Sequence, residues 1–353
     1  MPLPLYAAAL LPGLFALAAL LVGGAALWAT PLFVFGLVPL AELLLPAHAG
    51  PADPGAPSPA RRRIADALIA LTLPLQAAVV LAFLAGAASG AWSAAEWAGA
   101  LASTALGCGG YGINVAHELG HRPERGWRLA ARLLLVTSFY DHFYVEHNRG
   151  HHARVATDAD PASSRQGESL YAFWVRSMVG GYRSAFAIEA ARLHGKARHP
   201  VLSLQNTVFV GQLIQAALFT AAALTFGLLP ALGWLLAGLG GGLLLETINY
   251  IEHYGLRRAI GPDGRPERVR PAHSWNADHP FGRLLLFELT RHSDHHAHPA
   301  RPYAALRHFE AAPQLPTGYP GMMLLAAVPP LFFRVMDARL AAEQARLARA
   351  AAA

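Results

Sequence analysis

Nine of the seventeen histidines in the chain fall into four clusters whose spacing is suited to metal binding. The first cluster is His117-Glu-Leu-Gly-His121. Residues four apart share one face of a helix, so both imidazoles can reach the same ion. This HExxH pattern is also that of zinc proteases, in which the glutamate, here Glu118, acts as general base. The first cluster therefore predicts a metal site and leaves its chemistry open.

The second and third clusters each end in an adjacent pair of histidines. The second reads EHNRGHH over 146–152, and the third reads RHSDHHA over 291–297. Neighbouring residues on a helix point about 100° apart, so each adjacent pair is suited to two different metals in a shared site. The histidines of these clusters are His147, His151, His152, His292, His295 and His296.

A lone histidine, His253, directly follows a long apolar stretch and completes the set of nine. Nine imidazoles are too many for one ion but suit two ions at roughly four to five ligands each, and imidazole favours iron, copper, zinc and nickel. Four acidic residues next to these histidines are candidates to accept the second ring N–H of a ligand; a salt bridge with a nearby arginine is the alternative. They are Glu118, Glu146, Glu252 and Asp294.

The composition indicates the kind of domain that positions these clusters. Of 353 residues, 54% are hydrophobic and only 14% are charged, whereas a typical soluble domain has roughly 25% charged residues. A single cysteine, Cys108, excludes a disulfide framework and any cysteine-rich zinc or iron–sulfur site. A redox partner must therefore be a separate protein.

Six apolar stretches are long enough to cross a hydrocarbon core, which needs about 20 residues. They are predicted near 4–23, 25–46, 65–88, 95–116, 204–226 and 229–250. The pattern predicts an all-α polytopic membrane protein, with one domain over 1–336 and an Ala/Arg-rich helical or disordered tail over 337–353. The Pro- and Gly-rich segment 48–60 is expected to be a flexible connector without chemistry.

The basic residues predict the orientation. If the N-terminus is cytoplasmic, all 28 Lys and Arg residues fall in 47–64, 117–203 and 251–353, and the loops on the opposite side contain none. Such one-sidedness follows the positive-inside rule. All four histidine clusters begin on this same side, which predicts a cytoplasmic histidine-rich cap. The net charge of +6 is then better explained by anionic lipid headgroups than by nucleic acid.

At these residues the sequence resembles the alkane 1-monooxygenase family, within the membrane fatty-acid desaturase and hydroxylase superfamily. The resemblance covers roughly 60–336, and the EHYG and LPTGYPG stretches separate alkane hydroxylases from desaturases. The sequence departs from the family pattern at Thr290, Pro302 and Ala304. These are not ligand positions, so the departures bear on the surface that binds the partner or on the cavity near the metal pair rather than on metal binding. The matching blocks are HELGHR at 117–122, EHNRGHH at 146–152, ATDADPASSRQGES at 156–169, NYIEHYGL at 249–256, HSWN at 273–276, RHSDHHA at 291–297 and LPTGYPGMM at 315–323.

The resemblance implies hydroxylation of the terminal methyl of medium- or long-chain n-alkanes to primary alcohols, with O2 and with electrons from a separate rubredoxin and its reductase. It implies a multi-pass protein of the bacterial inner membrane whose cytoplasmic arginines are candidates to dock an acidic rubredoxin. It also implies two iron ions (Fe²⁺/Fe³⁺) with all-histidine ligation. The ligands carried over are His117, His121, His147, His151, His152, His253, His292, His295 and His296.

Several alternatives stay open on the residues. A xylene-type hydroxylase, a fatty-acyl hydroxylase or a desaturase of the same superfamily would share the histidines. An intramembrane zinc protease needs a third ligand in an Asp-Gly context within a span, but Asp263-Gly264 lies in a polar loop. A transporter or haem-anchoring protein is a third class. The sequence decides neither the preferred chain length nor the roles of His142, His273 and His279.

Overall fold

The computed structural model describes residues 3–45, 47 and 58–352, and within these ranges the protein is built from helices and loops. The described residues contain no strand, only isolated bridges at Ile260–Pro266 and Asn276–Gln314. The predicted all-α class is confirmed. The connector predicted over 48–60 lies outside the described residues except for 58–60, where the Ser58 hydroxyl caps the next helix by accepting from the backbone N–H of Arg61.

Five helical segments in the described part of the chain are long and apolar enough to cross a membrane. The first two join at Gly23 and Gly24, whose φ values of 76° and 62° lie in the left-handed region that glycine adopts without strain. The segments are Leu5–Val22 (η1, Leu3–Leu10, and α1, Leu11–Val22), Gly24–Leu44 (η2, Gly24–Trp28; α2, Ala29–Leu32; η3, Phe33–Leu37; α3, Val38–Leu44), Pro59–Ala88 (α4), Thr207–Phe226 (α11) and Leu228–His253 (α12).

The span predicted over 95–116 is not among these five, although its residues are helical. The chain runs through α5 (Ala94–Gly107), η4 (Cys108–Val115) and α6 (Ala116–Gly120). Buried polar residues such as Ser103, Thr104 and Asn114 make this stretch less apolar than the others. The element η4 is a π-helix, a form that often occurs at functional sites, and it leads directly into the first histidine pair. Its role as a sixth span stays a prediction.

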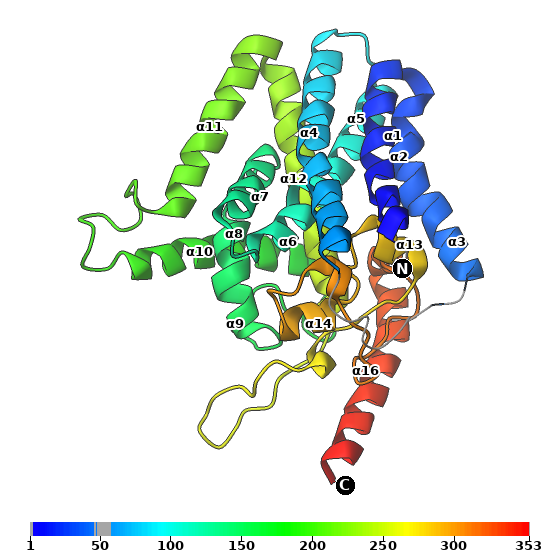
Figure 1. Cartoon of the computed structure of the whole chain (residues 1–353), viewed down its shortest axis with the longest axis vertical. Coiled ribbons are helices and arrows are strands. Elements are labelled where there is room, and N and C mark those ends of the chain that lie inside the picture. The colour runs from blue at the N-terminus through cyan, green and yellow to red at the C-terminus, as the bar shows by residue number, and fades with distance from the viewer. Residues whose placement is uncertain (1–2, 46, 48–57, 353) are drawn as a thin grey trace.

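Most of the remaining elements are short helices around the histidine region, and α10 and α16 are longer. In Figure 1 the long helices stand together in the upper half, and α6, α8, α9 and α14 gather near their lower ends. These elements are α7 (Arg125–Thr137), α8 (Phe143–Val145), η5 (Glu146–His151), α9 (His152–Arg154), α10 (Leu170–Arg192), η6 (Pro271–His273), α13 (Pro280–Leu285), α14 (His292–Ala297), η7 (Tyr303–Ala305), α15 (Tyr319–Ala326) and α16 (Pro329–Ala352).

The C-terminal helix α16 runs across the boundary predicted between 336 and 337. Leu340 is fully buried, and the Tyr254 hydroxyl donates a hydrogen bond to Asp337 Oδ1 at 2.8 Å. The first turns of α16 therefore pack on the end of α12, while its last turns extend away from the rest of the molecule (Figure 1). The start of a separate tail at 337 stays a prediction.

Two contacts fix the helices that carry the site. On α12, Gly241 faces Cys108 and Gly109 at the start of η4, so closely that a Cβ at 241 would lie 2.7 Å from Cys108 Cβ and 2.8 Å from Gly109 N. On α3, Glu42 is buried and its Oε1 accepts a hydrogen bond from the Gly282 backbone N–H at 2.7 Å. The first contact holds α12 against η4, and the second ties the second span to α13.

We predict that Gly241→Ala destabilises the protein by about 1–3 kcal/mol, because the added methyl group has no room between two helix backbones. The midpoint of thermal unfolding in detergent, together with the metal content, measures the effect. Gly126→Ala is the control, since a Cβ there meets nothing within 4 Å. An unfolding midpoint for Gly241→Ala equal to that of the control would contradict this packing.

Candidate metal centre

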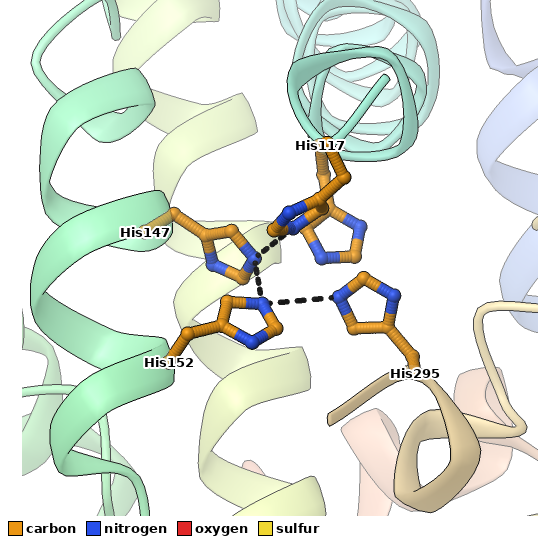
Figure 2. Close-up of side chains that lie close together, drawn as sticks. His117, His147, His152 and His295 are labelled. Atoms are coloured by element: carbon orange, nitrogen blue, oxygen red, sulfur yellow. Dashed lines mark hydrogen bonds between the residues drawn. The ribbon is translucent and has the colours of Figure 1, made fainter. Parts of the chain in front are cut away.

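The fold brings all nine predicted histidines together in two groups. Within each group, one nitrogen of every ring lies within 4.8 Å of the corresponding nitrogens of the others, so that each group could hold a metal ion. Figure 2 shows His117, His147, His152 and His295, from three separate helical segments, pointing toward one another. The first group is His117, His121, His147, His152 and His295, and the second is His151, His253, His292 and His296.

The ring atoms that converge are the Nε2 atoms. In the first group Nε2 of His147 lies 3.0 Å from that of His121 and 2.9 Å from that of His152. In the second group Nε2 of His292 lies 2.8 Å from that of His296 and 3.2 Å from that of His253. Each neutral imidazole has one N–H and one lone pair, so rings that all face inward cannot satisfy one another. An ion between the lone pairs would satisfy them.

The Nε2 of His117 gives an independent indication that the first group is a metal site. It is buried and has no hydrogen-bond partner among the described residues. A buried polar atom without a partner is costly and needs an explanation. Imidazole nitrogens are suitable donors for iron, so the residues of both groups fit the metal that the sequence predicted.

Each adjacent histidine pair is divided between the two groups. His151 and His296 belong to the second group, and their neighbours His152 and His295 belong to the first, as a helical step of about 100° requires. An α-helical interpretation would also place His147 with His151, four residues away. The structure instead joins His147 to His152, because η5 is a π-helix, in which residues five apart are linked.

Burial keeps these rings neutral, which is the form that binds metal. Burial lowers the pKa of His121 to about 4. For six other rings outside the membrane spans, burial and then the neighbouring imidazoles hold the pKa well below its usual value. These are His117, His147, His152, His292, His295 and His296.

Asp160 orients His151 and was missed by the sequence analysis. The Nδ1 of His151 lies 2.9 Å from Asp160 Oδ2, and the Ser163 hydroxyl donates to the same oxygen at 2.6 Å. Although burial acts to lower the pKa of His151, the Asp160 carboxylate raises it overall. A proton held on Nδ1 leaves Nε2 free to face an ion. Nine residues separate the two in sequence, and the only signal was that Asp160 falls in the block at 156–169.

Three of the four acidic candidates are paired with arginines. Glu118 Oε1 accepts from Arg122 at 2.8 Å, and Glu146 Oε1 accepts from Arg154 at 2.8 Å. Asp294 accepts hydrogen bonds from Arg301. These contacts correspond to the salt-bridge alternative. They anchor the segments that carry the histidines, since Glu118 also accepts from the backbone N–H of Tyr303 at 3.3 Å.

Glu252 differs from the other three because it approaches a ring of the second group. Its Oε1 accepts from the Tyr319 hydroxyl at 2.6 Å. Its Oε2 lies 3.1 Å from His292 Nε2 but without hydrogen-bond alignment, so this buried oxygen has no hydrogen-bond partner among the described residues. A carboxylate oxygen thus faces the second group. By contrast, His142, His273 and His279 belong to neither group.

An apolar cavity leads toward the first group from among the membrane helices. It has a volume of about 80 Å³ and is lined by η3, η4, α12 and α15, including Phe35, Gly110 and Leu245. Asn114 and Leu286 line both this cavity and a smaller one that reaches His117 and His295. Bulky apolar side chains surround the path, so it is suited to an unbranched hydrocarbon.

Comparison with known proteins assigns a family. The sequence profile of the fatty acid desaturase family matches residues 91–326. The chain is 39% identical over 312 residues to alkane 1-monooxygenase 1 of Alcanivorax borkumensis, covering 87% of this chain and 76% of the relative. It is 39% identical over 324 residues to alkane 1-monooxygenase 1 of Pseudomonas aeruginosa, covering 90% and 84%. It is 30% identical over 244 residues to the hydroxylase component of the xylene/toluene monooxygenase of Pseudomonas putida, covering 68% and 63%.

We predict that Asp160→Asn lowers the metal affinity of the second group by about 10–100-fold, because the amide no longer holds His151 in one orientation and tautomer. Metal retained by the purified protein during titration with a chelator measures this. Asp158→Asn is the matched control: its side chain is 85% exposed and, among the residues that the structure describes, pairs with Arg257. Equal metal retention in the two variants would show that Asp160 does not support the site.

Proposed function

Because the chain belongs to the alkane 1-monooxygenase family and is an alkane-hydroxylating monooxygenase, we propose that it oxidises the terminal methyl of medium- or long-chain n-alkanes at two iron ions. The observation that carries the proposal is the convergence of nine imidazoles in groups of five and four. Iron bound there supplies O2 activation, which a terminal C–H bond requires because it offers no polar handle to acid–base groups.

The protein's own residues hold and shape this centre. His117, His121, His147, His152 and His295 would bind one iron, and His151, His253, His292 and His296 the other. Neutral nitrogen ligands leave the irons more Lewis acidic than a carboxylate-rich set would. Asp160 holds a proton on Nδ1 of His151, and Glu252 offers one carboxylate oxygen on the side of the second iron.

The apolar cavity is the proposed path for the substrate. Alkanes partition into the bilayer, and the cavity lies among the spanning helices, so the chain can enter without crossing water. Its walls are mostly apolar and offer few polar partners to a substituent, which favours an unbranched chain that advances end first toward His117 and His295. Only the leading methyl group then reaches the metals, which accounts for terminal selectivity.

The proposed location is the bacterial inner membrane, with the histidines on the cytoplasmic side. The support is the distribution of the 28 Lys and Arg residues, which all lie in segments on the side of the histidine clusters. The five apolar helices described above provide the membrane anchor.

A separate rubredoxin is the proposed electron donor, and the loop over 257–270 is its proposed docking surface. This loop projects from the histidine region in Figure 1 and exposes Arg265 and Arg268. Arg258 ties the loop to the metal centre, since it donates to Ala153 O at 2.9 Å, one residue from His152. Exposed cations at this place would attract an acidic iron–sulfur protein and bring it near the metals.

The function is tested by product analysis with the purified enzyme, rubredoxin, its reductase and NADH. Octane is expected to yield 1-octanol, with much less product from xylene or an acyl substrate. Secondary alcohols, a desaturated acyl product or a preference for xylene would overturn the terminal-alkane assignment in favour of another member of the superfamily.

We predict that Gly110→Leu shortens the longest alkane accepted. A Cβ at Gly110 meets nothing within 4 Å, and the residue lines the apolar cavity, so leucine would occupy part of the path. The ratio of kcat/KM for dodecane to that for octane should fall about tenfold. Gly36→Leu is the control, because Gly36 also has open space but does not line the cavity. An unchanged ratio in Gly110→Leu would exclude this path.

We predict that Arg265→Glu combined with Arg268→Glu raises the KM for rubredoxin and weakens the salt dependence of turnover, while kcat at saturating donor changes little. The control is Arg198→Glu, an exposed arginine on the loop between α10 and α11. Steady-state kinetics over a range of NaCl concentrations distinguishes them. If both variants have the same KM, the loop over 257–270 is not the docking surface.

A further inference from the structure

Glu246 is a buried carboxyl of α12 that is held by neutral groups. The Tyr140 hydroxyl donates to Oε1 at 2.7 Å, the Ser177 hydroxyl donates to Oε2 at 2.5 Å, and the Asn249 amide donates to Oε2 at 3.3 Å. Nearby buried acids such as Glu118 and Glu146 are instead paired with arginines. A carboxylate without a counter-ion is costly to bury, and this burial favours the neutral acid. In that form the carboxyl O–H on Oε2 would donate to the Ser177 hydroxyl, which can also accept.

Glu246 lines a small cavity that reaches the metal centre. The cavity has a volume of about 20 Å³ and is bounded by His147 and His151, one from each histidine group, and by Glu146 and Asn249. A cavity of about 10–15 Å³ is sufficient for one water if it has two to four polar partners. The polar lining meets this condition. One water there would lie between the Glu246 carboxyl and the histidine groups.

A chain of polar groups connects the same cavity with the protein surface. Glu146 Oε2 is buried and has no hydrogen-bond partner among the described residues, while its Oε1 accepts from Arg154. Arg154 also donates to the Ser184 hydroxyl at 2.7 Å, and its side chain is 32% exposed. The small cavity is therefore linked through Glu146 and Arg154 to the protein surface, on a side that the substrate cavity does not use.

The reaction requires such a route. Hydroxylation of an alkane RH consumes O2, two electrons and two protons and yields ROH and water. The electrons come from the one-electron donor, and the alkane supplies neither proton, since the hydrogen it loses returns in the hydroxyl group of the product. The substrate cavity is lined mostly by apolar side chains, apart from Tyr111, Asn114 and Tyr319, and it lies among the membrane helices, away from a supply of solvent protons. The protons must reach a buried centre by another path.

We propose that Glu246 is the proton-relay residue of this monooxygenase. Its carboxyl O–H bond breaks as the proton passes to the water in the small cavity, and that water passes a proton to the oxygen atom that leaves as water. A proton from solvent then restores the acid, and two such transfers complete one turnover. The proposal rests on the proposed function, because only oxygen reduction at the histidine groups consumes these protons.

The alternative is that Glu246 merely joins α12 to α10 and to Tyr140 through its hydrogen bonds. A proton relay requires an acidic group at position 246, whereas a structural link requires a side chain of the same length that forms the same hydrogen bonds. Glutamine preserves the length and can keep hydrogen bonds to Tyr140 and Ser177 but carries no exchangeable acid, whereas aspartate preserves the acid but shortens the reach. A relay therefore tolerates aspartate better than glutamine, and a structural link tolerates glutamine better than aspartate.

The test compares Glu246→Gln and Glu246→Asp with wild-type holoenzyme, measuring 1-octanol and hydrogen peroxide formed per O2 consumed. Glu246→Gln should keep its metal content and its O2 consumption, but its alcohol yield should fall by at least about fivefold, with peroxide in its place. Glu246→Asp should keep more than half of the wild-type yield. Glu42→Gln, which removes another buried carboxyl, is the control. It should form as much 1-octanol per O2 consumed as the wild-type enzyme.

An infrared measurement gives a readout that does not depend on turnover. The wild-type minus Glu246→Gln difference spectrum should contain a carboxylic-acid C=O band that shifts in D2O, and Glu42→Gln should retain that band. If Glu246→Gln does not fold, Tyr140→Phe and Ser177→Ala each remove a hydrogen bond that holds the Glu246 carboxyl at the cavity, and they should also raise the peroxide yield. Alcohol yields in Glu246→Gln, Tyr140→Phe and Ser177→Ala within twofold of wild type would overturn the relay. Absence of alcohol from the wild-type enzyme would instead overturn the proposed function.

Discussion

The structure depends on holding nine imidazoles, with their lone pairs inward, in a site from which water is almost excluded. Desolvation keeps the rings neutral, which is why the pKa of rings such as His121 falls, and neutral rings facing each other cannot satisfy one another by hydrogen bonds. Only a cation between them removes this conflict. Metal binding and the folding of this region are therefore expected to be coupled.

The helices position the inward-facing imidazoles in two ways: by close contact between helix backbones and by local changes of helical register. Gly241 lets α12 lie against the start of η4, so that His253 at the end of α12 and His117 after η4 approach the same region. Two of the three π-helical segments in the described residues, η4 and η5, directly precede or contain ligand candidates. Around them, salt bridges such as Glu118–Arg122 and Glu146–Arg154 anchor the same short segments. The chemical site is thus fixed by pairs of elements that are distant in sequence.

Much of this arrangement could be predicted from the sequence because it depends on hydropathy and on local spacing. Five of the six predicted spans coincide with apolar helices, and the nine histidines named from their motifs all reach the two groups. The stretch over 95–116 differs because glycines and buried polar residues serve packing against α12 rather than contact with lipid.

The rest could not be predicted because it depends on tertiary contacts or on irregular helix geometry. The pairing of His147 with His152 requires the π-turn of η5, for which the sequence gives no signal. Asp160 and Glu246 act through contacts across 9 and 106 residues of sequence respectively, and neither stands beside a histidine motif. Sequence reasoning chose acids adjacent to the ligands, and three of those four proved to be bound to arginines.

The proposed metal centre holds two irons in unequal groups of five and four histidines. Mössbauer spectroscopy of ⁵⁷Fe-loaded enzyme, combined with metal analysis, distinguishes such a centre from one metal ion or from two equivalent sites. We expect two irons per chain and two distinct quadrupole doublets of equal area, one from each group of histidines. A single metal per chain, zinc in place of iron after expression in iron-supplied cells, or one doublet from two equivalent sites would contradict it.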